Sequence, residues 1–101
     1  MKYTVHLSPE AEADFDSYID YISDELDAPL TALKHYEGLS GKINELERNP
    51  KAYPMRNQKS LIKYGLFVRR VNYKRMAVLY TIFGDVVFIH RIIASSMITG
   101  L

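Results

Sequence analysis

The chain has 101 residues, of which 48% are hydrophobic and 25% charged, and this size and composition are those of a single soluble domain spanning residues 1–101. It contains no cysteine, which excludes disulfides, thiolate catalysis and cysteine-ligated zinc. No apolar run approaches the roughly 18–20 residues of a membrane span. We therefore expect a cytoplasmic protein without a secretory signal. Charge is divided unevenly along the chain. Residues 1–48 carry eleven acids against four bases (net −7), and residues 49–101 carry nine bases against one acid (net +8). The second half is therefore a candidate surface for nucleic acid or an acidic protein.

The first predicted elements are a strand and a helix. Residues Lys2 to Leu7 alternate apolar and polar side chains, which is the pattern of a half-buried strand. Ser8-Pro9-Glu10 then provides a hydroxyl N-cap, a proline in the first helical position and a carboxylate in the first turn. Apolar residues follow at spacings of three and four, which predicts a helix from about Pro9 to Leu26.

A second helix is predicted after the break at Asp27-Ala28-Pro29. Its apolar stripe continues to Asn49-Pro50, where the residue before proline disfavours helical geometry. Because the connection is short, the two helices should form an antiparallel hairpin. Gly38 and Gly41 lie inside the second helix, where each costs about 1 kcal/mol relative to alanine, and a close approach to the first helix is one explanation for them.

Residues 50–65 form the only irregular stretch, a basic loop, and the remainder of the chain is typical of strands. The three predicted strands are separated by Lys74-Arg75 and Gly84-Asp85, gaps so short that they require an antiparallel meander: Leu66–Tyr73, Met76–Phe83 and Val86–Ile93. In the last strand, strict alternation places Val86, Phe88, His90 and Ile92 on one face. Its other face is also largely apolar, which predicts a central strand beside the N-terminal one, with the hairpin covering one side of an α+β fold.

The order of these elements and several local strings resemble the RelE/ParE superfamily of toxins, nearer its ParE-like branch. The strings that carry the resemblance span nearly the whole chain: Tyr3 to Glu12, Asn49-Pro50-Lys51-Ala52-Tyr53-Pro54, Val68-Arg69-Arg70-Val71, Ala77 to Ile82 and Asp85 to Ile92. No single string is specific, and the set in its expected order carries the argument.

The resemblance implies a toxin of a bacterial type II toxin–antitoxin module that is bound by a cognate antitoxin in a hetero-oligomer. It leaves the target open. Toxins similar to RelE cut messenger RNA on the ribosome, whereas toxins similar to ParE poison DNA gyrase and need no hydrolytic site. A third reading is a degenerate member of the family that only binds its antitoxin.

Departures from the RelE-like pattern favour the gyrase reading. RelE-like nucleases carry an arginine three residues before the tyrosine of the middle strand, where this chain has Ala77. They often close with a basic motif, where this chain has Ala94-Ser95-Ser96-Met97. Arg69 and Arg70 do match the basic second strand of those nucleases, so whether the chain is an enzyme stays open.

RNA cleavage would need a base, an acid and positive charge beside the phosphate. The weak candidates for these roles are His90, Tyr80 and Arg70. The alternative reading of His90 and Tyr80 is that both are packed side chains, since each shares a strand face with apolar neighbours. His6, His35 and His90 show no metal-ligand spacing, and the chain has no glycine-rich phosphate loop, so we expect neither metal nor cofactor.

The sequence therefore favours a ParE-like toxin that acts by binding its target. The expected partners are a cognate antitoxin, laid as an amphipathic helix on the hairpin with an extended segment at a sheet edge, and DNA gyrase, with ribosome-bound messenger RNA as the alternative target. The basic loop of residues 50–65 is expected to face the target. The basic side chains around the meander are expected to face it as well: Arg69, Arg70, Lys74, Arg75 and Arg91.

Overall fold

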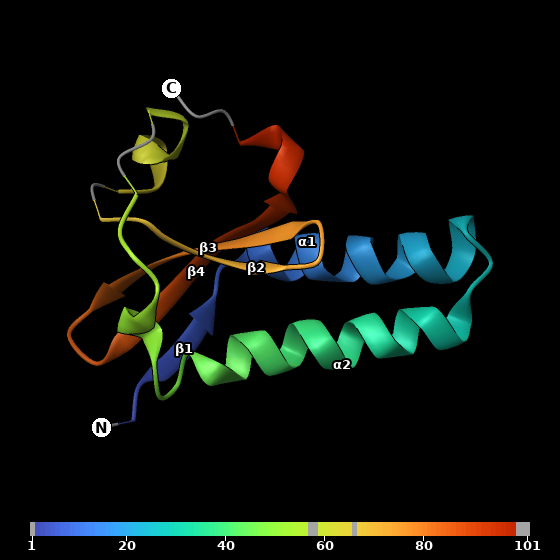
Figure 1. Ribbon diagram of the computed structural model, residues 1–101, viewed down its shortest axis with the longest axis horizontal. Coiled ribbons are helices and arrows are strands. Elements are labelled where there is room, and N and C mark those ends of the chain that lie inside the picture. Colours follow the sequence, from blue (N-terminus) through green and yellow to red (C-terminus); the bar gives the residue numbers. More distant parts are fainter. Residues whose placement is uncertain (1, 57–58, 66, 99–101) are drawn as a thin grey trace.

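A helical hairpin packs on one face of a four-stranded sheet in the computed structural model, which describes residues 2–56, 59–65 and 67–98 (Figure 1). The helices are α1 (Pro9–Asp20), which continues into a π-helical turn (Tyr21–Glu25), and α2 (Pro29–Glu45). The strands are β1 (Thr4–Leu7), β2 (Arg69–Tyr73), β3 (Met76–Phe83) and β4 (Val86–Ala94). Short 3-10 segments occupy Pro50–Ala52, Lys59–Tyr64 and Ser95–Met97.

The sheet has the strand order β1-β4-β3-β2. β1 pairs with β4 in parallel, and the remaining neighbours are antiparallel. The predicted α+β fold, the meander and the central position of the last strand are thus confirmed. None of the helices in the described part of the chain is long and apolar enough to span a membrane.

Both helices begin where the sequence predicts. The Ser8 hydroxyl accepts a hydrogen bond from the Ala11 backbone N–H at 3.0 Å and so caps α1. After the π-helical turn, Asp27 adopts a left-handed conformation, with φ of 49°, and reverses the chain into α2 at Pro29. α2 ends at Glu45, earlier than predicted, because residues 46–48 form a tight turn in which the Asn49 N–H bonds the Glu45 carbonyl.

Gly38 marks a close approach, although the approaching element is β2 and not the first helix. A Cβ atom at Gly38 would overlap the ring and hydroxyl of Tyr73. Tyr73 packs there against His35 of α2. The two rings meet edge-on, with their centroids 5.8 Å apart. The second glycine, Gly41, has open space around it.

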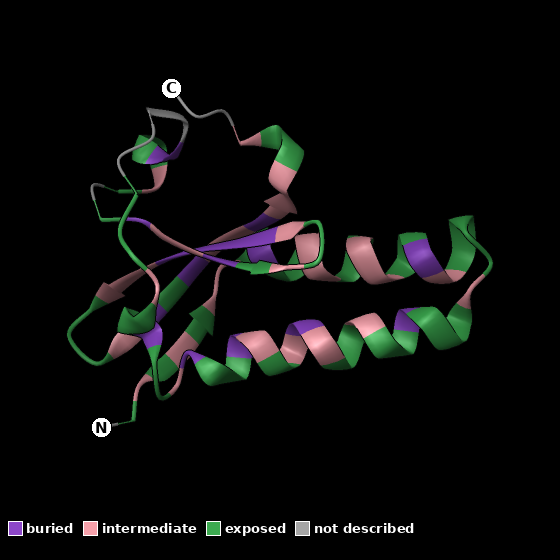
Figure 2. Ribbon diagram, in the orientation of Figure 1, coloured by how far each residue is buried: buried purple, intermediate pink, exposed green. Residues whose placement is uncertain are grey.

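The main core lies between the hairpin and the sheet (Figure 2). The buried side chains of α2 face the sheet and meet apolar residues from every strand except β1, whose alternate residues pack at its margin as the period-2 pattern predicted. A smaller core on the opposite sheet face joins Leu61 of the Lys59–Tyr64 segment to Val68, Ala77 and Leu79. Both faces of the sheet are therefore covered, the second one by the basic loop.

A β-bulge at His90 changes the predicted faces of β4. Leu79 pairs with Arg91 and Tyr80 pairs with Ile89, so that His90 is an extra residue without a partner on β3. The strict alternation expected from the sequence is wrong beyond this point, since Ile92 joins Val87 and Ile89 in the main core. A bulge adds one residue to a strand and so reverses the sides of everything that follows.

β2 is shorter than the predicted strand Leu66–Tyr73. It begins at Arg69, Phe67 lies in a turn, and Leu66 lies outside the described residues. The chain before β2 is instead held by the preceding loop, because the Arg56 N–H bonds the Val68 carbonyl at 2.7 Å and Met55 forms an isolated bridge with Arg69.

Candidate functional site

The five basic residues predicted to face the target do not share one face of the sheet. Arg69 pairs with Tyr80 and Arg70 with Leu79, so the two arginines point to opposite faces, as the alternation predicted. Lys74 and Arg75 lie in the exposed β2–β3 turn, where Lys74 has a left-handed φ of 55°. Arg91 lies across the sheet on β4.

Arg69 joins β2 to the loop that follows α2. Its Nη1 atom donates to the Tyr53 carbonyl at 2.6 Å and lies 3.4 Å from the Lys51 carbonyl. A guanidinium that bonds two loop carbonyls is fixed in direction, so Arg69 orders the segment around Pro50–Ala52 as well as carrying charge.

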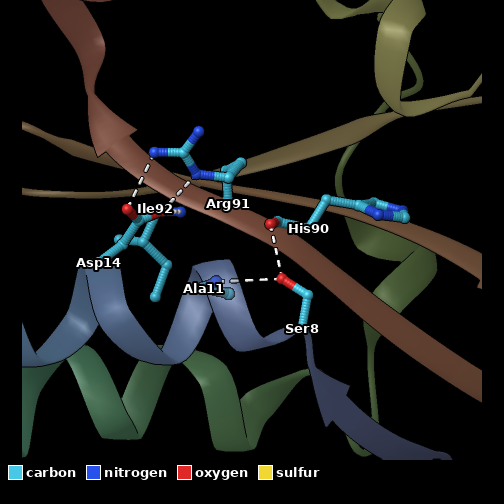
Figure 3. A network of polar contacts seen from close by, with 6 residues as sticks. All are labelled: Ser8, Ala11, Asp14, His90, Arg91 and Ile92. Atoms are coloured by element: carbon cyan, nitrogen blue, oxygen red, sulfur yellow. Dashed lines mark hydrogen bonds and ion pairs between the residues drawn. The ribbon is translucent and has the colours of Figure 1, made fainter.

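Arg91 belongs to a polar network at the free edge of β4 (Figure 3). Its Nε and Nη2 atoms donate to the two oxygens of Asp14 at 2.7 and 2.9 Å, and the Ile92 N–H donates to Asp14 Oδ2 at 2.9 Å. Hydrogen bonding to Asp14 raises the pKa of Arg91 further above its usual range. Beside this pair, the Ser8 hydroxyl that caps α1 donates to the His90 carbonyl at 2.8 Å. The Arg91 charge is thus partly balanced within the fold.

Tyr80 is fully buried in the main core. Its hydroxyl donates to the Pro50 carbonyl at 2.6 Å, and burial raises the pKa of Tyr80 well above its ordinary value. This confirms the reading of Tyr80 as a packed side chain. In this position its proton is held by a buried acceptor and is remote from solvent.

His90 lies on the opposite face from Tyr80. Its Nε2 atom is 2.8 Å from the Thr81 hydroxyl, and its ring stacks on Tyr64 with the centroids 6.0 Å apart. Burial lowers the pKa of His90, which favours a neutral ring at pH 7. Arg70, the third weak candidate, donates through Nε to Asn72 at 2.7 Å. The acid and base considered for RNA cleavage are therefore separated by the sheet.

Two of the surface grooves in the described part of the chain are lined by residues of the predicted recognition surfaces. The first, of about 380 Å³, lies between α1 and α2, with Phe15, Tyr36 and Ile43 in its walls and the carboxylates of Glu12 and Asp16 beside them. Phe15 and Tyr36 meet edge-on in its wall, with their centroids 5.3 Å apart.

The second groove, of about 460 Å³, lies at the end of the sheet remote from the β2–β3 turn. We call it the Phe67 groove, and its walls come from three separate segments: Lys51, Met55, Phe67, Arg69, Ile82 and Gly84. Sequence reasoning assigned Lys51 and Arg69 to a basic surface and missed the apolar partners. The available signal was Phe67, a large aromatic residue placed directly before a pair of arginines.

Within residues 2–56, 59–65 and 67–98, no group of three or more His, Cys, Asp or Glu side chains is arranged to hold a metal ion. The arrangement instead offers two recognition surfaces of opposite charge. One is the acidic hairpin groove, and the other is the basic Phe67 groove.

Comparisons with known proteins agree with this architecture. The profile of a family described as the ParE toxin of type II toxin–antitoxin system, parDE, matches residues 5–99. Among solved structures, the chain is similar to one described as the chromosomal ParDE TA system from P. aeruginosa, with a TM-score of 0.72 and 19% identity over 92% of this chain and 96% of that one. No curated protein sequence matches the chain. The structural likeness shows the fold, and the family match covers nearly the whole chain. The chain therefore belongs to the ParE toxin family of type II toxin–antitoxin systems.

Proposed function

We propose that this ParE-family toxin arrests bacterial growth by binding DNA gyrase in the cytoplasm and is neutralised by a cognate antitoxin. Membership of the family implies an antitoxin partner. The charges proposed to face the target are the five meander residues and the basic loop. Lys74 and Arg75 are the more exposed of the five, since Arg69, Arg70 and Arg91 also bond within the fold. Carried on a plasmid, such a module would stabilise that plasmid.

The observation that carries this proposal is the separation of Tyr80 from His90. General acid–base catalysis requires both groups within hydrogen-bond reach of one substrate. Tyr80 is buried against Pro50 on the hairpin side, and His90 stacks on Tyr64 on the other. Inhibition by binding requires no such pair, and the arrangement supports binding for that reason.

Two assays on the purified toxin test the proposal together. In a supercoiling assay, we expect the toxin to inhibit gyrase, and in primer extension on messenger RNA from a cell-free translation reaction, we expect intact transcripts. Unimpaired supercoiling together with new ends inside codons, absent without ribosomes, would contradict the proposal.

Those new ends would support a ribosome-dependent RNA endonuclease, the second candidate function. The observation that favours it is His90, which burial keeps neutral and able to accept a proton, on the same sheet face as Arg70. In that case Tyr64, which stacks on His90, would be the phenol to examine as the acid.

The hairpin groove is the surface that we propose for the antitoxin. An amphipathic helix fits a groove with apolar walls, and basic side chains on its flanks would complement Glu12 and Asp16. The paired substitution E12R/D16R should abolish neutralisation by the antitoxin encoded beside the toxin and leave growth arrest intact. Asp85→Arg, in the β3–β4 turn, is the control that should remain neutralised. Unchanged neutralisation of E12R/D16R would contradict this placement.

A further inference from the structure

We propose that the Phe67 groove is the part of the basic surface that recognises the target, and that it binds an acidic protein segment whose apolar side chain enters the groove. This inference rests on the proposed function, because it requires a protein target. It also selects one end of the sheet. The β2–β3 turn, with Lys74 and Arg75, lies at the opposite end of β2 from Arg69.

The walls of the groove are tied together by backbone and side-chain bonds. Met55 bridges Arg69, and the Arg56 N–H bonds the Val68 carbonyl at 2.7 Å, so the loop runs beside the start of β2. Arg69 Nη1 then bonds the Tyr53 carbonyl at 2.6 Å. A groove that is ordered before binding loses little conformational freedom when a ligand enters it.

Large apolar side chains remain exposed in this groove. Phe67 is 63% exposed and Met55 is 50% exposed, and both lie beside the half-buried Ile82. Ile82 packs against the main core, whereas Leu61 and Val68 belong to the small core on the opposite sheet face and do not line the groove. Aromatic residues and arginine are enriched at the centres of protein interfaces, where a few such residues provide most of the binding energy.

Charge complementarity identifies the chemistry of the partner. Lys51 and Arg69 line the groove and Arg56 follows Met55, whereas Asp85 is the single acid in residues 49–101. Because Arg69 is already oriented by two carbonyls, its guanidinium can meet a carboxylate without further ordering. An acidic segment therefore matches the rim of the groove, and an aliphatic or aromatic side chain matches its floor.

A protein segment fits better than a single-stranded nucleic acid. Binding of single strands relies on successive aromatic platforms along a basic track. In this groove one aromatic ring, Phe67, is accompanied by the aliphatic side chains of Met55 and Ile82. Such walls suit one apolar side chain flanked by carboxylates.

The experiment compares two groove variants with two matched controls. Lys51→Glu and Phe67→Ser alter the groove, while Lys34→Glu alters an exposed lysine of α2 and Phe83→Ser alters a phenylalanine that is 81% exposed outside the groove. Circular dichroism and thermal unfolding establish that all four fold. We expect each groove variant to bind purified gyrase at least about tenfold more weakly and to lose growth arrest, and each control to behave as wild type. Equal effects at Lys34 and Lys51, or no effect at Phe67, would overturn the inference.

A second probe separates this inference from the proposed function. The ¹⁵N-labelled toxin is titrated with an acetylated Glu-Asp-Leu-Glu-Asp-Phe peptide and, separately, with a twelve-residue oligothymidylate. We expect peptide-induced shifts around Met55 and Arg69 that disappear in Phe67→Ser, even if gyrase proves not to be the target. No peptide shifts at the groove, or oligothymidylate binding that depends on Phe67, would overturn the inference. Failure to inhibit gyrase with the peptide result intact would overturn only the proposed function.

Discussion

Asp14 takes the place of a missing strand at the edge of β4. The last pair between β1 and β4 joins Leu7 to Ile89, so the edge beyond it has no strand neighbour on that side. The Ser8 hydroxyl donates a hydrogen bond to the His90 carbonyl, and the Asp14 carboxylate accepts one from the Ile92 N–H. These two backbone groups of β4 are therefore paired with α1 and its N-cap in place of a strand. The same carboxylate holds Arg91. One residue therefore fixes the first helix to the central strand.

Asp14→Ala should lower the free energy of unfolding by about 2 kcal/mol, because it leaves the Ile92 N–H without its acceptor and Arg91 without its partner. Urea denaturation measures the change. Asp16→Ala, which removes an exposed carboxylate from the same helix, is the control and should change stability by less than about 0.5 kcal/mol. A similar loss in both variants would mean that the network contributes nothing specific.

His90 makes the stability of the fold depend on pH. Burial lowers the pKa of His90 in the folded protein. Below about pH 6.5, the ordinary pKa of histidine, His90 is therefore protonated more fully in the unfolded chain than in the folded one. The contribution of neutral His90 to stability is therefore complete above that pH and is lost as the pH falls below it towards the lowered pKa of the folded protein. The groups that face it are Thr81, Tyr64 and the adjacent Arg91, and none of them offers a carboxylate.

The test is to measure unfolding free energies from pH 7.5 to pH 5 for the wild type and for His90→Gln. The wild type should lose more stability over this range, by up to about 1.4 kcal/mol per pH unit for a single proton. His6 and His35 are present in both proteins and cancel in the difference. Parallel pH profiles would show that His90 ionises equally in the folded and unfolded chains.

At the scale of elements, the contact between α2 and β2 depends on one glycine. Tyr73 of β2 occupies the space in which a Cβ of Gly38 would lie, and its ring meets His35 on the same helix. His35 in turn accepts or donates a bond of 2.6 Å with the Tyr18 hydroxyl of α1. Helix α2 therefore contacts both α1 and the edge strand through one short aromatic series.

Gly38→Ala and Gly41→Ala should have opposite effects on stability. At Gly38 the added methyl group displaces Tyr73, which should destabilise the protein by about 1–3 kcal/mol. At Gly41 nothing lies within 4 Å, so alanine should stabilise the helix by up to about 1 kcal/mol. Thermal unfolding of both variants checks the pair, and a gain in stability at Gly38 would show that the strand and helix are not in contact there.

The elements themselves could be predicted from the sequence because each one has a local signal. Ser8-Pro9 starts α1, Pro29 starts α2, and the two-residue gaps at 74–75 and 84–85 create the meander. The bulge at His90 has no such signal, since both faces of this strand are largely apolar and the sequence fits either assignment of faces beyond it. Its consequence, the burial of Ile92 beside Val87, could therefore only be seen in three dimensions.

At the scale of the whole molecule, the candidate site is less predictable than the fold. The charges of Lys51 and Arg69 were visible in the sequence, but the groove they line also needs Met55, Phe67 and Ile82. These residues come from a loop, a turn and a strand end, and no periodicity connects them. Conversely, Arg91 looked like a surface cation, and its partner Asp14 lies 77 positions away in the chain. Long-range pairs of this kind decide which of several arginines is available to a partner.

The uneven division of charge gives a last prediction, on the response of target binding to salt. If the basic half binds an acidic protein segment, raising the salt concentration from 50 to 200 mM should slow association with gyrase by about tenfold. The dissociation rate should stay within about twofold, because charges at the rim of an interface accelerate association more than they slow dissociation. Surface plasmon resonance separates the two rates. If the target were RNA, six or more phosphate contacts would weaken equilibrium binding by about a thousandfold over the same range. The hairpin carries the excess of acids and would therefore repel RNA. The antitoxin, as a basic helix, could still bind the hairpin groove while the Phe67 groove binds the target.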